Sequence, residues 1–173
     1  RDTFWRTLQA FALTRTLIAA VLLGYFGMGS SKLWLHKDNF WGACVVYLVL
    51  ALLFVLLSLY WRRRFLFQVM LQVSVDIVAI SMLYLSAGGI KSGLAILYLF
   101  PLAGGAILAP LVLALFFVST ATLVLLAENG YQLLNDSADI SSSQVGLYGA
   151  AFFIIIFAIN RLAARLILSL IHI

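Results

Sequence analysis

Charged residues are scarce in this chain, and their scarcity excludes an ordinary water-soluble domain. Of its 173 residues, 10% are charged and 65% are hydrophobic, whereas a soluble domain has about 25% charged and about 45–50% apolar residues. The single cysteine, Cys44, excludes an internal disulfide and is predicted to pack as a small hydrophobic side chain. Strictly alternating apolar segments, the mark of a membrane β-barrel, are also missing. The long apolar stretches that remain predict membrane-spanning helices, whose backbone hydrogen bonds are satisfied internally in lipid.

Motifs that carry chemistry are missing as well. The two histidines, His36 and His172, are far apart in sequence, and no phosphate-binding glycine loop, Ser/His/Asp set or cysteine cluster occurs. His172 also lacks the acidic neighbour of a phosphoacceptor helix. We therefore predict no catalytic, cofactor-binding or metal-binding residue in this segment. The net charge of +5 does not indicate a nucleic-acid partner, because the basic residues stand at the ends of apolar spans, where insertion topology requires them.

Six apolar stretches predict an all-α integral membrane bundle of six transmembrane helices. They lie at about residues 8–28, 40–60, 65–85, 94–108, 111–130 and 145–163. The second stretch is close to the roughly 20 residues that cross a bilayer at 1.5 Å per residue. We expect the fourth to be broken by Pro101 and Gly104-Gly105. The first has a competing interpretation as a signal peptide, because a basic start and a short apolar core precede small residues.

The ends of the chain suggest a piece of a longer protein. The sequence begins at Arg1 rather than methionine and stops inside an apolar run. We interpret residues 1–166 as the membrane domain and residues 167–173 as a truncated or non-native tail.

The arginines predict how the helices cross the membrane. With the amino terminus inside, the cytoplasmic side receives Arg1, Arg6, Arg62, Arg63, Arg64, Arg161 and Arg165. The opposite orientation would expose all seven outside, against the positive-inside rule. Both termini are therefore expected in the cytoplasm. The turn at Ala109-Pro110 is the weak point of this topology, because no basic residue anchors it inside.

Polar residues within the spans are the candidate functional residues. Asp76 lies near the middle of the third span, where a carboxylate costs roughly 2.5–3.5 kcal/mol and needs a partner or a proton. Gln68 and Gln72 share its helical stripe at steps of four residues. Arg15 lies at a similar depth, so a buried ion pair is geometrically possible. Two interpretations stay open: this polar seam fixes helix packing, or it is a switch or recognition surface within the membrane.

Other spans contain weaker signals. Glu128, near the outer end of the fifth span, is either a second intramembrane recognition residue or an interfacial carboxylate that reaches water. Small residues that would let helices approach closely are Gly24, Gly27, Gly104, Gly105, Gly146 and Gly149.

Four stretches resemble the membrane sensor domain of PilS-type histidine kinases, the two-component sensors that control type IV pilin transcription. They are residues 5–8 with Thr14-Arg15, residues 71–77 (LQVSVDI), residues 86–94 (SAGGIKSGL) and residues 120–128. The aspartate and the glycine turn are the distinctive part. The resemblance extends to about Leu166, but Ala109-Pro110 departs from it, since a basic residue is expected there.

The resemblance implies functions that the residues alone do not show. A full-length relative would carry a cytoplasmic PAS domain, a dimerising phosphoacceptor helix and a kinase domain that uses ATP and Mg²⁺. It would phosphorylate itself on histidine and pass the phosphoryl group to a response regulator. It would be a homodimer in the bacterial inner membrane, and its membrane domain would sense pilin through the transmembrane helix of pilin. All catalytic parts would lie beyond Ile173.

We therefore expect a membrane-embedded signal-input domain that is not itself an enzyme. The loops at residues 29–39 and 135–144 are too short for an extracytoplasmic ligand domain, so the signal would be read within the bilayer. The sixth helix would pass a shift through Arg161 and Arg165 to cytoplasmic domains. Two alternatives are a small transporter or channel subunit that uses the seam as a midplane site, and a membrane scaffold without a signal.

Overall fold

The computed structural model describes residues 2–28, 37–86, 94–135 and 142–171, and these residues are helical apart from short connections. Residues 87–93 of the predicted glycine turn and most of the two predicted loops lie outside the described residues, as do His36 and His172, while Ser86 ends a helix. The chain divides into two compact units, Arg1–Gly88 and Gly89–Ile173.

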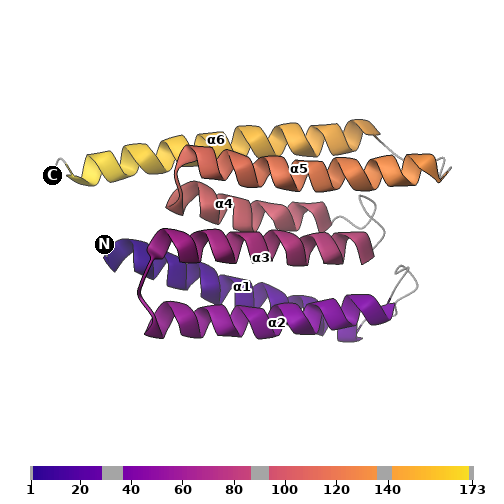
Figure 1. The fold of residues 1–173 in the computed structure, drawn as a ribbon, viewed down its shortest axis with the longest axis horizontal. Helices are drawn as coiled ribbons and strands as arrows, with labels where there is room; N and C mark the ends of the chain where they lie inside the picture. The colour runs from indigo at the N-terminus through magenta and orange to yellow at the C-terminus, as the bar shows by residue number, and fades with distance from the viewer. Residues whose placement is uncertain (1, 29–36, 87–93, 136–141, 172–173) are drawn as a thin grey trace. The chain divides into compact units, whose positions relative to one another are not determined.

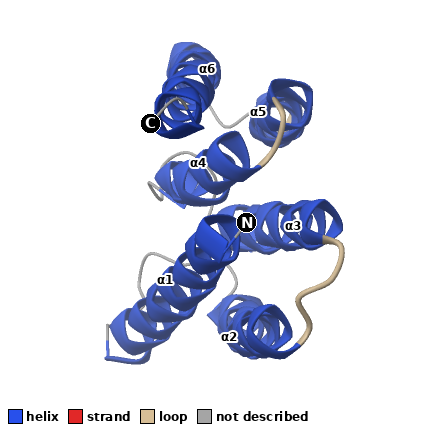
Figure 2. Ribbon diagram, turned by 90° about the vertical axis from the view of Figure 1, so that its left-hand side faces the viewer, coloured by secondary structure: helices blue, strands red, loops and turns tan. Residues whose placement is uncertain are grey.

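The first unit contains three long helices, α1 (Asp2–Met28), α2 (Lys37–Tyr60) and α3 (Phe65–Ser86). α2 packs against both α1 and α3, and Figure 2 shows α1 inclined to the other two. The buried faces of α1 and α2 carry alanines, among them Ala12 and Ala51, each 0% exposed. Short side chains let helix backbones approach closely where no hydrophobic effect drives helices together in lipid.

A four-residue linker joins α2 to α3, and Gln68 holds it in place. The Gln68 Nε2 group donates to the Trp61 carbonyl at 2.6 Å and to the Arg63 carbonyl at 3.0 Å. The Gln68 backbone N–H donates to the Arg64 carbonyl at 3.0 Å. Arg64 has a φ of 50°, a left-handed conformation that is uncommon for residues other than glycine. One buried amide therefore fixes a tight connection between two spans.

The second unit begins with a short 3₁₀ helix, η2 (Leu94–Tyr98), which continues as α4 (Leu99–Leu108). The break predicted at Pro101 and Gly104-Gly105 is wrong, because α4 runs unbroken through all three residues. Pro101 lies in the first turn of α4, where its missing N–H would have no intrahelical partner. Together η2 and α4 extend over about 25 Å, because a 3₁₀ helix rises further per residue than an α-helix.

Two long helices complete this unit, α5 (Leu111–Leu134) and α6 (Ser142–Ile171) (Figure 1). They approach closely at Gly149, where an added Cβ would lie 2.8 Å from Thr122 Cγ2. Gly24 and Gly146 have open space instead, so the expectation of close approach fails for these two glycines. The Gly149–Thr122 contact is thus a specific crossing point of α5 and α6.

The turn between α4 and α5 is tied to α6 by Asn160. Pro110 has no N–H to donate to the Ala106 carbonyl four residues earlier, so that carbonyl lacks its helical partner. Asn160 Nδ2 donates to this carbonyl at 2.9 Å and to the Ala109 carbonyl at 3.3 Å. The turn that has no basic anchor in the sequence is therefore held by an amide from α6.

Five of the described helices are long and apolar enough to cross a membrane, and the 94–108 segment is a shorter apolar helix. The helices extend beyond the predicted spans: α1 begins at Asp2, α2 at Lys37 and α6 at Ser142. The span prediction follows apolar side chains, whereas helical hydrogen bonding continues into polar sequence at the membrane surface. The fold is an all-helical membrane bundle.

Candidate functional site

The centre of the first unit contains a buried ion pair between α1 and α3. Arg15 Nε lies 2.6 Å from Asp76 Oδ1, and the two side chains are 3% and 0% exposed. Arg15 shares its buried face of α1 with Leu8, Ala12 and Ala19, at the three- and four-residue spacing of one helix stripe. Among the described residues this is the one ion pair, and it joins two helices that are far apart in sequence.

Two further side chains extend the ion pair into a network. Arg15 Nη1 donates to Gln72 Oε1 at 3.0 Å, and the Tyr47 hydroxyl donates to Asp76 Oδ1 at 3.0 Å. The Arg15 guanidinium also lies 5.4 Å from the centre of the Phe54 ring, within cation–π distance. We call Arg15, Tyr47, Gln72 and Asp76 the polar network. Because Tyr47 lies on α2, the network connects all three helices of the unit.

The polar network is not saturated. Asp76 Oδ2 and Gln72 Nε2 are buried, and neither has a hydrogen-bond partner among the described residues. A buried polar atom without a partner costs about 1–3 kcal/mol. The network therefore joins three helices, while one carboxylate oxygen and one amide nitrogen, four residues apart on α3, have no partner among the described residues.

The other predicted site residues lie elsewhere. Gln68 is buried on the predicted stripe, but its amide binds the α2–α3 linker rather than the ion pair. Glu128 belongs to α5 in the second unit, where it is 8% exposed and accepts a hydrogen bond from Gln132. Its side chain is therefore mostly buried, with a local partner one turn along the helix.

Sequence reasoning missed Tyr47 and Asn160. Tyr47 follows Cys44 and precedes Ala51 and Phe54 on the buried stripe of α2, so helical spacing alone could have identified it as an inward hydroxyl. Asn160 carries no such signal, because its partners are backbone carbonyls exposed by a proline some fifty residues earlier. Only the three-dimensional contact reveals its role.

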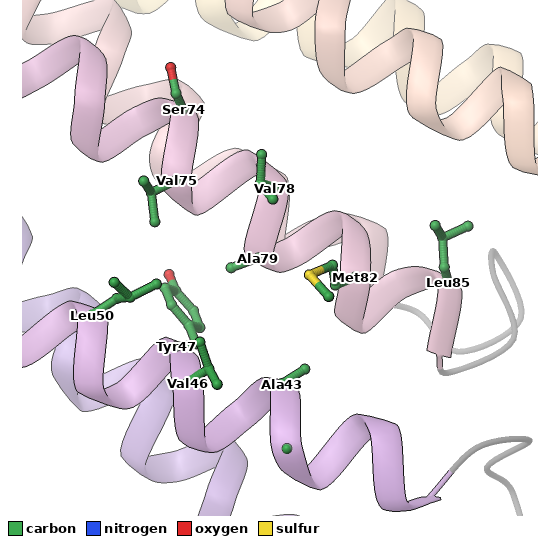
Figure 3. Close-up of a pocket in the computed structure, with 11 residues that line it drawn as sticks. Ala43, Val46, Tyr47, Leu50, Ser74, Val75, Val78, Ala79, Met82 and Leu85 are labelled. Atoms are coloured by element: carbon green, nitrogen blue, oxygen red, sulfur yellow. The ribbon is translucent and has the colours of Figure 1, made fainter.

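A groove of about 780 Å³ lies between α2 and α3, next to the polar network (Figure 3). Its lining is mainly apolar and includes short residues from both helices: Gly42 and Ala43 from α2 and Ala79 from α3. Tyr47 also lines the groove, and Figure 3 shows it projecting from α2 toward α3. The Tyr47 side chain thus belongs to both the groove and the network.

The side chains that could bind a metal or act as a nucleophile are few in the described part of the chain. Within the described ranges, no group of three or more His, Cys, Asp or Glu side chains gathers where a metal could bind. Cys44 is buried and free. What the site contains is an ion pair and a hydrogen-bond network that joins three helices, beside a groove between α2 and α3.

Comparison with known proteins places this arrangement in a family. Searches among curated proteins and among solved structures gave no match. The PilS-like transmembrane domain matches residues 1–170, nearly the whole chain and both structural units. The six described helices, five of them long and apolar enough to span a bilayer, agree with a multi-pass membrane domain. The chain therefore belongs to the PilS-like transmembrane domain family.

Proposed function

We propose that this chain is the signal-input domain of a PilS-type sensor histidine kinase and that it reads a transmembrane helix of pilin within the bilayer. The parent protein is then a homodimer in the bacterial inner membrane with cytoplasmic termini. Its PAS and kinase domains use ATP and Mg²⁺ to phosphorylate a histidine and then a response regulator. Membership of the PilS-like family supports the assignment as a membrane sensor domain. The other parts of the proposal rest on the resemblance to PilS-type kinases.

The observation that carries the proposal is the position of Tyr47. Its ring lines the α2–α3 groove, while its hydroxyl donates to Asp76 in the ion pair with Arg15. A helix that enters the groove displaces or fixes this ring. The change in the Tyr47–Asp76 contact then alters the packing of α1 against α3, and a ligand shifts such an equilibrium only through contacts that differ between the two packings.

The apolar lining of the groove favours a helix of pilin as its occupant. The groove is mainly apolar, and its walls are formed by α2 and α3 (Figure 3). Gly42, Ala43 and Ala79 are short, and small residues are what allow two helix backbones to approach within a bilayer. Ser74, which also lines the groove, adds a hydroxyl that can bond across helices.

Photocrosslinking in cells tests the occupant directly. A crosslinking amino acid is placed at Val46, which lines the groove and is 58% exposed, and as a control at Leu13, which is 60% exposed on α1. The intact kinase is expressed with pilin. We expect a pilin adduct from position 46 and none from position 13. An adduct with a second copy of the kinase at position 46, or no adduct at all, would contradict pilin as the occupant.

A transcriptional reporter tests whether the groove transmits the signal. Ala79→Phe fills the groove, whereas Ala20→Phe adds the same ring to an exposed position of α1. We expect Ala79→Phe to abolish the change in reporter output when pilin is expressed, and Ala20→Phe to retain it at the same protein level. Equal responses from both variants would refute signalling through this groove.

A further inference from the structure

A second hollow lies at one end of the first unit, apart from the polar network and the α2–α3 groove. Its volume is about 380 Å³, and it is lined by Phe4 and Trp5 of α1, by Arg62 and Arg64 of the linker, and by Phe65 of α3. This volume is within the range of about 300–1,000 Å³ typical of small-ligand sites. The sequence analysis assigned these arginines only to membrane topology.

The ends of three candidate membrane spans assign the hollow to the membrane–water interface. It lies where the span Thr3–Gly24 begins, Gly42–Tyr60 ends and Phe65–Leu85 begins. The Phe65 ring packs against both aromatic residues of α1, with ring centres 5.2 Å from Trp5 and 5.9 Å from Phe4. Aromatic rings prefer the headgroup level of a bilayer, so this wall suits the glycerol region of a lipid.

The described residues that line the hollow carry only positive charge. The guanidinium groups of Arg62 and Arg64 have no ion pair or hydrogen bond with any described side chain, and no acidic residue is among the described residues that line the hollow. Guanidinium groups bind phosphate oxygens through paired N–H donors. The first turn of α3, which begins at Phe65, adds backbone N–H groups without helical partners at the same edge.

The linker backbone presents the two arginines in a fixed arrangement. Arg64 has the left-handed φ of 50°, and such a conformation persists in a non-glycine residue only where the surroundings determine it. Gln68 supplies that constraint through its bonds to the Trp61 and Arg63 carbonyls. Arg63, between the two, does not line the hollow. Of the three consecutive arginines, Arg62 and Arg64 therefore line the hollow and Arg63 does not.

We propose that this hollow binds the phosphate group of an anionic phospholipid headgroup from the surrounding leaflet. Two guanidinium groups hold the phosphate, and the aromatic wall packs against the glycerol and upper acyl chain. Basic pockets between transmembrane helices recognise anionic headgroups in this way. The site is independent of the proposed pilin recognition, because it shares no lining residue with the α2–α3 groove.

Native mass spectrometry of the full chain in neutral detergent tests this site. Phosphatidylglycerol and phosphatidylcholine are titrated against Arg62→Gln, Arg64→Gln and the matched control Arg63→Gln, which removes the same charge from the same linker. We expect wild type to retain phosphatidylglycerol preferentially. Each lining substitution should weaken this retention by about five-fold, and Arg63→Gln by less than about two-fold.

Further measurements separate this site from its alternatives. Arg64→Gly keeps the left-handed backbone without strain, so it should lose phosphatidylglycerol as Arg64→Gln does while its melting temperature is unchanged. Equal losses for all three glutamine variants would overturn the site in favour of general positive charge. Absence of any preference over phosphatidylcholine would also overturn it. Displacement of the lipid by inorganic phosphate would show that free phosphate is the ligand.

Discussion

Removing Asp76 alone should be much more damaging than removing Asp76 and Arg15 together. Asp76→Asn keeps the shape of the side chain but leaves the Arg15 guanidinium, 3% exposed, without a counter-charge inside the first unit. A guanidinium cannot lose its proton in a protein, so its charge stays buried or must reach water by moving α1. The single substitution therefore creates an uncompensated charge in the middle of a helix bundle.

The expected loss of unfolding free energy follows from the burial of the Arg15–Asp76 ion pair. Breaking a buried ion pair on one side costs about 3–5 kcal/mol, whereas replacing both partners with uncharged residues of similar volume is often close to neutral. Arg15→Met combined with Asp76→Asn removes both charges and keeps most of the volume. Arg15→Met alone should cost less than Asp76→Asn alone, because a lone carboxylate can be neutralised by a proton. We expect the double variant to be more stable than Asp76→Asn.

The assay is reversible unfolding of the purified chain in mixed micelles, followed by far-ultraviolet circular dichroism. The double-mutant cycle isolates the coupling between the two residues, which touch directly and should be non-additive. If the double variant loses as much stability as the two single variants added together, Arg15 and Asp76 do not interact, and the argument from the 2.6 Å contact fails.

Other contacts give smaller expected effects, measurable by thermal unfolding in micelles. Gly149→Ala places a Cβ 2.8 Å from Thr122 Cγ2 and should destabilise the protein by about 1–3 kcal/mol. The control Gly146→Ala has open space around its Cβ and should leave stability unchanged. Similar losses of stability in the two variants would contradict a close crossing of α5 and α6 at Gly149. Asn160→Leu should cost about 1 kcal/mol by leaving two carbonyls of the α4–α5 turn unpaired, and unchanged stability would refute the tie. Tyr47→Phe removes the hydroxyl that donates to Asp76 and should also cost about 1 kcal/mol of stability. The same variant should reduce the pilin-dependent reporter response. A full response would exclude the hydroxyl from signalling.

The helices, and the possibility of an ion pair between Arg15 and Asp76, could be predicted from sequence because both follow from the geometry of a regular helix. Apolar runs and their flanking arginines indicate the spans, and steps of three and four residues place Gln68, Gln72 and Asp76 on one face of α3. A matching depth then suggests Arg15 as a partner for Asp76. Each of these inferences needs only the rise and the turn of an α-helix.

The rest of the site depends on contacts that spacing does not encode. Gln68 lies on the same face of α3 as Asp76, but its amide donates hydrogen bonds to the linker carbonyls of Trp61 and Arg63. Asn160 bonds to two carbonyls of the α4–α5 turn, next to Pro110, and Arg64, which lines the hollow, has a left-handed φ. Such features arise where backbone geometry departs from a regular helix, so helical periodicity cannot predict them.

The ion pair between α1 and α3 also has a consequence for how the protein is made. Chains are synthesised from the amino terminus, so α1 reaches the membrane before the ribosome has produced Asp76. During that interval Arg15 has no carboxylate, and α1 is the least apolar of the five long spans. We therefore expect α1 to remain in the insertion machinery, or to slide toward the surface, until α3 arrives and retains it. Truncated nascent chains that end before Asp76 should be extracted from membranes by alkaline carbonate more readily than chains that include it.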